Sequence, residues 1–278
     1  MKNKSYIIIV AVLGFVTFGM QSFEASIKLA KSDKYRVIKI NGKIVFIKSG
    51  NGMKIGDYFV TGTPLKFSTM RDRAAVINRE KGRFILQPSV KGKPKVLPAI
   101  SNIATRGEVE VLINLLDVKN YFSEKCLFLN EITLKMGKEA FMLDEENFFY
   151  VTFKYNDEKV AKKIPNGEQS IIISSEKLFT IDGKRVPVKE LEMTLFYRKA
   201  DKTIREVNSF IPVFPDDAIL KQEITVLLDE LNAETYLEKE KEIIAFLNEF
   251  YGKPQKNNLR NWLSKEMNLK MDKNINFK

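Results

Sequence analysis

Short runs of β-branched and aromatic residues, separated by turn residues, recur along most of this chain. The first clear case is the run 35–40, which is followed by Asn41-Gly42 and then by the run 43–48. An Asn-Gly pair between two such runs is a strong hairpin signal, because a type I′ turn requires positive φ at both central positions. The pattern therefore restricts the chain to a fold built mainly from short, closely spaced strands.

Further strands are predicted at 58–61, 65–67, 73–78 and 83–87, with turn residues between them. Strands at this spacing are typical of a small sandwich or barrel. From Ile27 to Ile100 the chain carries 17 Lys and Arg against 4 Asp and Glu. We therefore predict a small basic β domain over residues 26–90.

The glycines and alternating residues of this domain follow a recognisable order. Gly42-Lys-Ile44, Lys54-Ile-Gly-Asp57, Val60-Thr-Gly62 and Leu65-Lys-Phe67 resemble the opening of the FecR-like β domain, over about residues 42–67. That domain occurs in exported signalling and envelope proteins, so the resemblance implies a periplasmic binding or sensing module. The family's cytoplasmic segment has no counterpart before the apolar run at the N-terminus, and direct sigma-factor signalling is not expected.

The next part of the sequence is predicted to connect two domains. Prolines, glycine and lysines alternate between Pro88 and Arg106, which is typical of a linker. Near-helical spacing of apolar residues from Glu108 to Phe122 predicts one short helix, with a strand around Val109 and Val111 as the alternative. We assign residues 91–122 to a linker and a short helix.

The β pattern returns over residues 123–214, starting with a strand at 127–134. Turns are predicted at Asn156-Asp157, Asn166-Gly167 and Asp182-Gly183. Strand count and spacing predict an immunoglobulin-like β-sandwich without the disulfide of antibody domains. Its aromatic stripes are interpreted as core, with a ligand platform as the alternative. One such stripe places four alternating residues on one face, namely Phe149, Val151, Phe153 and Tyr155.

The last part, residues 215–278, is predicted to be helical. Pro215-Asp216-Asp217 suits a first helical turn, and Thr235 with Glu238 forms a capping box for a second helix. Gly252 ends that helix, and a third, shorter one is predicted around Trp262. The predicted fold class is thus mainly β, with two sandwich-like or barrel-like modules and a C-terminal α-helical segment.

The N-terminal residues predict export. Met1-Lys-Asn-Lys4 precedes an uncharged run of 19 residues, Ser5 to Phe23, as in a bacterial secretory signal peptide. We predict that residues 1–25 are a cleaved signal peptide. The alternatives are an uncleaved membrane anchor, because the run just reaches across a bilayer, and a buried N-terminal helix of a cytosolic protein. The first two predict a periplasmic or cell-envelope location.

The charge of the chain, +11 in total, is unevenly distributed. In contrast to the basic stretch from Ile27 to Ile100, residues 216–249 contain 3 Lys against 10 Asp and Glu. Such oppositely charged ends can attract each other within one chain or between neighbouring chains, or each can simply be a solvated face. Because export removes the chain from the cytosol, we expect no nucleic acid as a partner despite the basic charge of residues 27–100.

The side-chain inventory excludes several chemistries. The sequence has no histidine and a single cysteine, Cys126. This excludes Ser-His-Asp and Cys-His catalysis, histidine zinc motifs, cysteine metal clusters and an intrachain disulfide. Cys126 lies in an apolar run and is predicted to be a buried structural thiol.

The remaining routes to catalysis use carboxylates or a Ser-Lys pair. The acids Asp144-Glu145-Glu146 and Asp216-Asp217 are adjacent in sequence, which does not oppose two carboxylates across a substrate. The pair Ser174 and Lys177 is attributed to turn chemistry. We therefore predict no enzyme activity and no catalytic, cofactor-binding or metal site; a carboxylate-based cell-wall hydrolase is the enzymatic alternative.

Together these features predict a non-enzymatic, exported envelope protein that acts as a binding or scaffolding module. The alternative is a structural subunit of an envelope-spanning secretion or injection assembly. Expected partners are an envelope protein or a second copy, bound through β edges or the oppositely charged ends, and an anionic cell-surface polymer.

Overall fold

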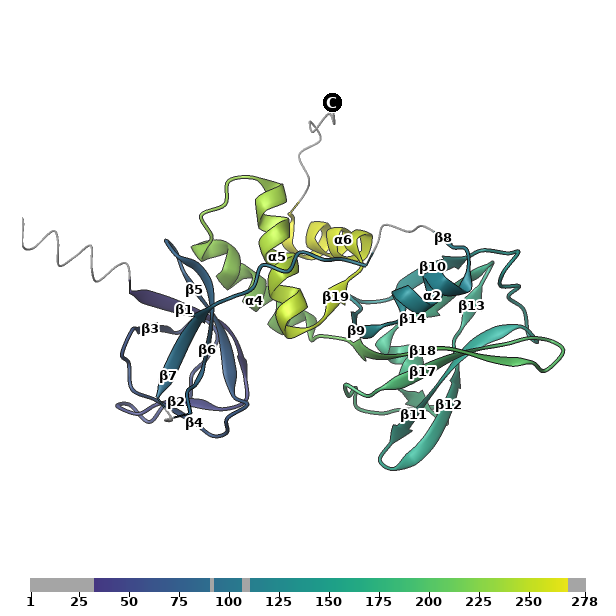
Figure 1. Cartoon of the computed structure of the whole chain (residues 1–278), viewed down its shortest axis with the longest axis horizontal. Helices are drawn as coiled ribbons and strands as arrows, with labels where there is room; N and C mark the ends of the chain where they lie inside the picture. Colours follow the sequence, from purple (N-terminus) through teal and green to yellow (C-terminus); the bar gives the residue numbers. More distant parts are fainter. Residues whose placement is uncertain (1–32, 91–92, 107–110, 270–278) are drawn as a thin grey trace, which may run out of the picture. The chain divides into compact units, whose positions relative to one another are not determined.

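The computed structural model describes residues 33–90, 93–106 and 111–269 (Figure 1). Strands make up 39% and helices 23% of the chain, with helices at its C-terminal end, which confirms the predicted fold class. The chain divides into two compact units. Unit 1 contains the residues up to Ala99 together with Gln222–Asn232, and unit 2 contains Ile100–Lys221 and the residues from Ala233 onward.

The predicted leader, residues 1–25, lies outside the described residues. Within the ranges that are described, none of the helices combines the length and the apolar character needed to span a membrane.

Unit 1 is built on an antiparallel half-barrel in the strand order β3-β1-β5-β6-β7 (Figure 1). The bounds are Lys34–Asn41 for β1, Tyr58–Val60 for β3, Arg73–Asn78 for β5, Gly82–Pro88 for β6 and Pro94–Pro98 for β7. A second sheet pairs β2 (Ile44–Phe46) with β4 (Leu65–Phe67). Residues from both sheets, among them Val37, Leu65 and Val76, share one apolar core.

The hairpin predicted at Asn41-Gly42 is wrong. Strand β1 pairs with β3 and β5, whereas β2 pairs with β4, so the two runs around this turn lie in different sheets. Of the two turn residues only Gly42 has positive φ, +93°. A Cβ at Gly42 would lie 2.2 Å from Asp72 Oδ1, and the Asp72 carboxylate accepts hydrogen bonds from the backbone of Ser68 and Thr69. The loop around Asp72 therefore leaves no room for a side chain at position 42.

Part of the predicted linker is a strand. Residues 91–122 were assigned to a linker and a helix, yet β7 pairs with β6 from Pro88↔Pro94 to Phe84↔Pro98. Because β7 is the outermost strand of its sheet, its prolines can face away from the ladder without leaving a hydrogen bond unmade. Alternating lysine and proline therefore marked an edge strand here.

Part of the C-terminal helical segment belongs with the first β module. Helix α4 spans Asp217–Glu230, and its residues from Gln222 onward group with unit 1. There Lys39 Nζ lies 3.0 Å from Glu223 Oε1, and Arg36 lies 3.1 Å from Asp229. The boundary predicted at residue 215 therefore does not coincide with the division into units.

These contacts show the within-chain form of the predicted attraction between basic and acidic segments. The Tyr58 hydroxyl adds a hydrogen bond of 2.7 Å to Glu230 Oε1, and this bond to a carboxylate raises the pKa of Tyr58. Glu223 is 1% exposed, so its pairing with Lys39 is largely shielded from solvent. Association between copies through the charged ends stays a prediction.

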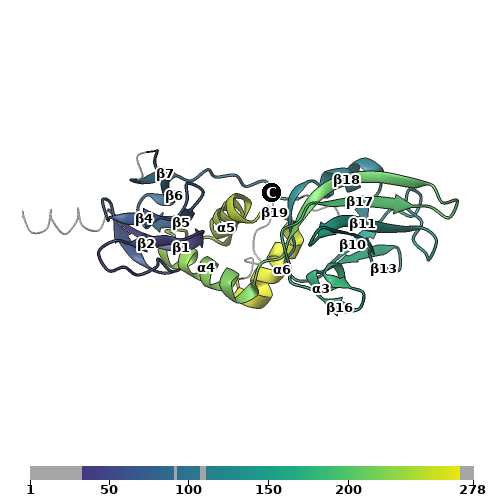
Figure 2. The same cartoon turned by 90° about the horizontal axis from the view of Figure 1, so that it is seen from below.

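Unit 2 contains two main sheets that pack on a shared core. The six-stranded sheet has the order β12-β11-β17-β18-β9-β19, and the four-stranded sheet has the order β13-β14-β10-β8. Figure 2 shows β17 and β18 on one side of the unit and β10 and β13 on the other. The bounds in the first sheet are β12 Glu158–Lys163, β11 Phe148–Tyr155, β17 Met193–Arg198, β18 Ile204–Val213, β9 Glu124–Leu127 and β19 Lys253–Pro254.

The second sheet and the helices complete unit 2. Its strands are β13 Asn166–Gly167, β14 Ser170–Ile173, β10 Ile132–Met136 and β8 Val111–Leu112, and a ribbon pairs β15 (Thr180–Ile181) with β16 (Lys184–Arg185). The helices are α2 Leu115–Tyr121, α3 Ser175–Leu178, α5 Tyr236–Phe250 and α6 Lys256–Met267. Of the segment predicted as one helix, Glu108 and Val109 lie outside the described residues. The described part holds the strand β8 at Val111, in agreement with the strand alternative, followed by the helix α2.

The two-sheet arrangement differs from an immunoglobulin sandwich in its pairing. Strand β9 runs parallel to both β18 and β19, and β10 runs parallel to β8, whereas the immunoglobulin pattern is antiparallel. Strands β8 and β19 also come from outside the predicted range 123–214. The single strand predicted at 127–134 is wrong as well, since Asn130 has φ +62° and separates β9 from β10.

Locally determined features of unit 2 follow the sequence closely. The predicted core stripe of β11 is confirmed, because Phe149, Val151, Phe153 and Tyr155 are all buried. The turns at Asn156-Asp157 and Asp182-Gly183 are confirmed, with positive φ at both residues of each pair. The turn predicted at Asn166-Gly167 lies two residues later, since these residues pair as β13 with Ser170 and Ile171. The capping box between Thr235 and Glu238 is also present.

Gly252 ends helix α5 in a conformation that other residues rarely adopt. Its φ is +116°, and a Cβ there would lie 2.6 Å from Lys125 Cβ. We expect Gly252→Ala to lower the free energy of unfolding by about 2–3 kcal/mol, through backbone strain and the close contact together. In Gly183→Ala, where φ is +76° with open space around it, strain alone should cost about 1 kcal/mol. Urea denaturation measures both; equal losses would contradict a role for the contact.

Candidate functional site

Among the acids and the Ser-Lys pair considered in the sequence, Asp144, Ser174 and Asp217 make structural hydrogen bonds. Asp144 Oδ1 accepts hydrogen bonds from the backbone of Glu146 at 2.8 Å and of Asn147 at 2.6 Å. Ser174 caps helix α3 by accepting from Lys177 N at 3.2 Å, so the spacing that resembles a catalytic dyad is that of an N-cap. Asp217 accepts from the Trp262 indole at 3.0 Å. The structure does not bring these groups together at one site.

Cys126 is buried, as predicted. Burial raises the pKa of its thiol to about 11, so the thiolate, which is the nucleophilic form, is scarce at neutral pH. Among the described residues there is no group of three or more Cys, Asp or Glu side chains that could hold a metal ion.

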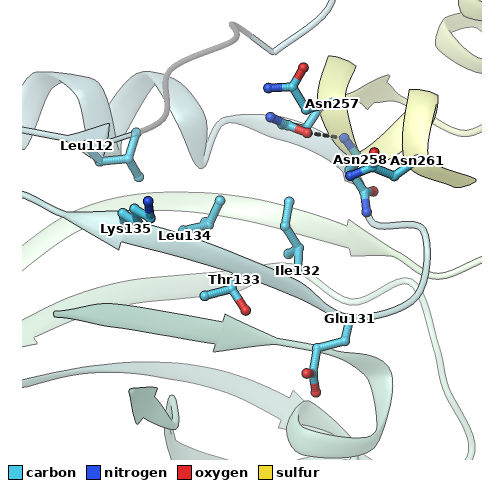
Figure 3. Close-up of a pocket in the computed structure, with 10 residues that line it drawn as sticks. Leu112, Glu131, Ile132, Thr133, Leu134, Lys135, Asn257, Asn258 and Asn261 are labelled. Atoms are coloured by element: carbon cyan, nitrogen blue, oxygen red, sulfur yellow. Dashed lines mark hydrogen bonds between the residues drawn. The ribbon is translucent and has the colours of Figure 1, made fainter. Parts of the chain in front are cut away.

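One hollow of unit 2, of ≈ 330 Å³, lies between helix α6 and strand β10. Figure 3 shows Asn257, Asn258 and Asn261 on the helix side, with Ile132 and Leu134 pointing toward the helix from the strand. Carboxamides both donate and accept hydrogen bonds, and the lining also includes Glu131 and Lys135, so this hollow suits a polar group.

The best-placed carboxamide of this hollow already has a structural partner. Asn258 Nδ2 donates to Leu129 O at 2.9 Å, and Asn258 Oδ1 accepts from Leu129 N at 3.0 Å. This reciprocal pair ties the start of α6 to the segment between β9 and β10. The hollow is therefore a weaker candidate than the surface described next.

The outer face of the six-stranded sheet carries a second cluster, which we name the aromatic–basic face. It consists of Phe148, Tyr150, Lys163, Phe196, Arg198 and Ile204. Opposite residues of antiparallel strands share a face, and the register pairs Tyr150 with both Lys163 and Phe196. It also pairs Arg198 with Phe148 and with Ile204. Alternation along β11 keeps this face apart from the buried stripe, because neighbouring side chains point to opposite sides.

The rings of this face form a continuous aromatic surface. Tyr150 and Phe196 stack with centroids 5.1 Å apart and planes 15° from parallel, and Phe148 lies 6.2 Å from Tyr150. Lys163 Nζ lies 4.3 Å from the centroid of Phe148, and Arg198 Cζ lies 5.5 Å from it. Cations at these distances are attracted to the ring. Lys163 and Arg198 therefore lie beside a hollow of ≈ 340 Å³ that is also lined by Ile204.

The rows next to the aromatic–basic face are polar. Thr152 lies opposite Thr194, and the Thr194 and Ser209 hydroxyls are 3.0 Å apart. One step further along, Lys154 lies opposite Lys159. The surface thus offers flat rings, hydroxyl groups and ammonium groups in successive rows, a combination that can hold an extended ligand with ring faces and negative charge.

The sequence held a signal for this face that the core interpretation missed. Phe148, Phe149 and Tyr150 are consecutive, and in a strand consecutive aromatic residues must lie on both faces. Phe149 is buried in the core, so Phe148 and Tyr150 must lie on the outer face of the sheet. That Phe196 would lie beside Tyr150 depends on strand register, which the sequence did not reveal.

Comparison with known proteins adds no relative to these observations: no family model and no curated protein matches the chain. The resemblance to the FecR-like domain over about residues 42–67 therefore stays a prediction.

Proposed function

We propose that this chain is a non-enzymatic binding protein of the bacterial cell envelope, and that its aromatic–basic face holds an anionic sugar polymer. The observation that carries the proposal is the stacked pair Tyr150 and Phe196 with Lys163 and Arg198 beside it. Flat, partly exposed rings on a rigid sheet complement the apolar faces of sugar rings and lose little conformational entropy on binding.

Charge favours an anionic polymer over a neutral one. Lys154 and Lys159 lie opposite each other and add two cations to Lys163 and Arg198. One acid, Glu206, lies opposite Phe196 on the same face, so the cations outnumber it. Cations that line one surface raise the local concentration of anionic ligands and speed their association. The predicted export of the chain is consistent with this ligand class, because anionic polymers are abundant in the envelope.

Two of the sheet edges are poorly suited to pairing with another chain. Strand β12 ends the six-stranded sheet and carries Lys159, Lys162 and Lys163, and β7 ends the half-barrel and carries Pro94 and Pro98. Lysine and proline on edge strands discourage pairing with another chain. This weighs against association of an assembly subunit through these two edges.

Titration calorimetry with oligogalacturonate, an anionic sugar polymer, tests the proposal. We expect Tyr150→Ala to weaken binding about tenfold or more, since truncation of a central aromatic residue of a binding surface costs roughly 2 kcal/mol or more. Lys163→Gln should weaken binding by a smaller factor and reduce its salt dependence. The matched control is Lys184→Gln, at an exposed lysine of another strand, β16, and it should bind like the unsubstituted protein.

Two further ligands separate the possible sources of affinity. A neutral glucan of equal length should bind more weakly, and polyphosphate, which has charge but no rings, should bind without any effect of Tyr150→Ala. Equal affinity of the Tyr150 variant and the unsubstituted protein for oligogalacturonate would overturn the proposal. So would the absence of measurable binding to that polymer at low salt.

A further inference from the structure

The loop end of unit 1 exposes apolar side chains that the fold itself does not use. Ile47 follows β2, Val60 ends β3 and Met70 follows β4. Their exposed fractions are 58%, 48% and 63%, respectively. Single exposed apolar residues are common on protein surfaces, whereas a group of them at one place marks a contact site.

These side chains lie together around two adjoining hollows. The first, of ≈ 410 Å³, is lined by residues that include Ile47, Leu65 and Met70. The second, of ≈ 670 Å³, shares Ile47 and Leu65 with the first and extends to Val60 and Lys93. Ile47 N donates to Pro64 O at 3.1 Å, which fixes the β2 loop beside the loop before β4. The exposed residues therefore form one apolar surface.

Basic residues surround this apolar surface. Lys66 lines the first hollow and Lys93 the second, while Lys48 and Arg71 each follow one of the exposed apolar residues. The sequence segments 43–56, 58–71 and 83–99 contain no Asp or Glu.

Two acids adjoin these segments. Asp72 is 5% exposed and accepts three hydrogen bonds from Ser68 and Thr69, and Asp57 is half-buried and accepts one from Lys54 N at 2.7 Å. Asp33, whose backbone accepts a hydrogen bond from Thr61, is partly exposed but paired with Lys81, so the charged side chains around the two hollows are positive on balance.

We propose that this loop end docks on an anionic lipid bilayer, with Ile47 and Met70 entering the headgroup region and Lys66, Arg71 and Lys93 against lipid phosphates. An apolar centre surrounded by cations matches the two layers of a bilayer surface, which presents negative headgroups above hydrocarbon. A protein partner would need carboxylates around an apolar site, and a soluble polyanion would leave Ile47 and Met70 exposed. The inference concerns unit 1 and does not depend on the proposed function of the aromatic–basic face.

A fluorophore at Met70 tests the contact directly in the full chain. The only native cysteine, Cys126, is 0% exposed, so a thiol-reactive dye will label an introduced cysteine selectively. We expect Met70→Cys carrying an environment-sensitive dye to shift its emission to the blue when phosphatidylglycerol vesicles are added. Met142→Cys is the matched control, because Met142 is 55% exposed and lies in unit 2. Its dye should show no shift.

Charge variants and a second ligand complete the test. Each of Lys66→Gln and Arg71→Gln should lower the vesicle affinity about fivefold, as expected for about 1 kcal/mol per basic residue near a membrane. Ala161→Cys, on the outer face of β12, should show no vesicle response and so separates this inference from the proposed function. The proposal fails if the Met70 dye does not respond, or responds equally to neutral phosphatidylcholine vesicles. It also fails if polyphosphate alone produces the same shift.

Discussion

Replacing Arg106 with leucine is expected to lower the free energy of unfolding by about 3–5 kcal/mol, because several backbone carbonyls lose a charged donor at once. Arg106 is 6% exposed and donates to Ser123 O at 2.5 Å, to Lys125 O at 2.9 Å and to Lys253 O at 3.3 Å. It also donates to the carbonyl of Tyr121. One guanidinium thus joins the end of α2 to the strands β9 and β19.

Chemical denaturation followed by circular dichroism measures this loss. Arg106→Lys should recover only part of it, since an ammonium has three donors and cannot reach carbonyls on opposite sides as a planar guanidinium does. Arg205→Leu is the control, at an exposed position of β18, and should change stability by less than about 0.5 kcal/mol. If Arg106→Leu also changed the free energy of unfolding by less than about 0.5 kcal/mol, water would be replacing the guanidinium without cost.

The second large effect is expected at the ion pair between α5 and α6. Arg260 Nε lies 2.5 Å from Glu240 Oε1, and a second guanidinium nitrogen donates to Oε2 at 3.0 Å. The Glu240 side chain is 2% exposed. Arg260→Met leaves this carboxylate with the Tyr236 hydroxyl, 3.5 Å away, as a donor. We expect a loss of about 3–5 kcal/mol, because a buried charge then lacks its counter-ion.

A double substitution distinguishes a buried charge from lost packing. Arg260→Met with Glu240→Leu removes both charges, and most of the lost stability should return. Lys265→Met on the same helix is the control, because Lys265 is 78% exposed and its ion pair with Glu266 spans 3.8 Å. If the double variant were as unstable as Arg260→Met alone, packing rather than charge would account for the loss.

The titration of Tyr236 reports on the same buried pair. Burial and the nearby Glu240 charge raise the pKa of Tyr236 to about 12, since both disfavour the phenolate. Neutral Glu240 replacements should therefore lower this pKa.

Local sequence signals determined the elements whose hydrogen bonds lie within a few residues. The capping box of Thr235 and Glu238, the helix end at Gly252 and the turn at Asp182-Gly183 each satisfy the backbone locally. The buried stripe of β11 follows from alternation, which is likewise a property of one strand. Fold class and the side-chain inventory, including the absence of histidine, were accessible at this level too.

Only the tertiary structure decided which of these elements meet. The Asn41-Gly42 signal was strong, yet β1 pairs with β3 and β5 and β2 pairs with β4, so partners distant in sequence decided the pairing. Tyr150 and Phe196 are 46 residues apart in sequence and become neighbours through the register between β11 and β17. Arg106 likewise binds carbonyls of α2, β9 and β19. Such contacts depend on the total burial and hydrogen bonding of the folded chain, which no short stretch of sequence encodes.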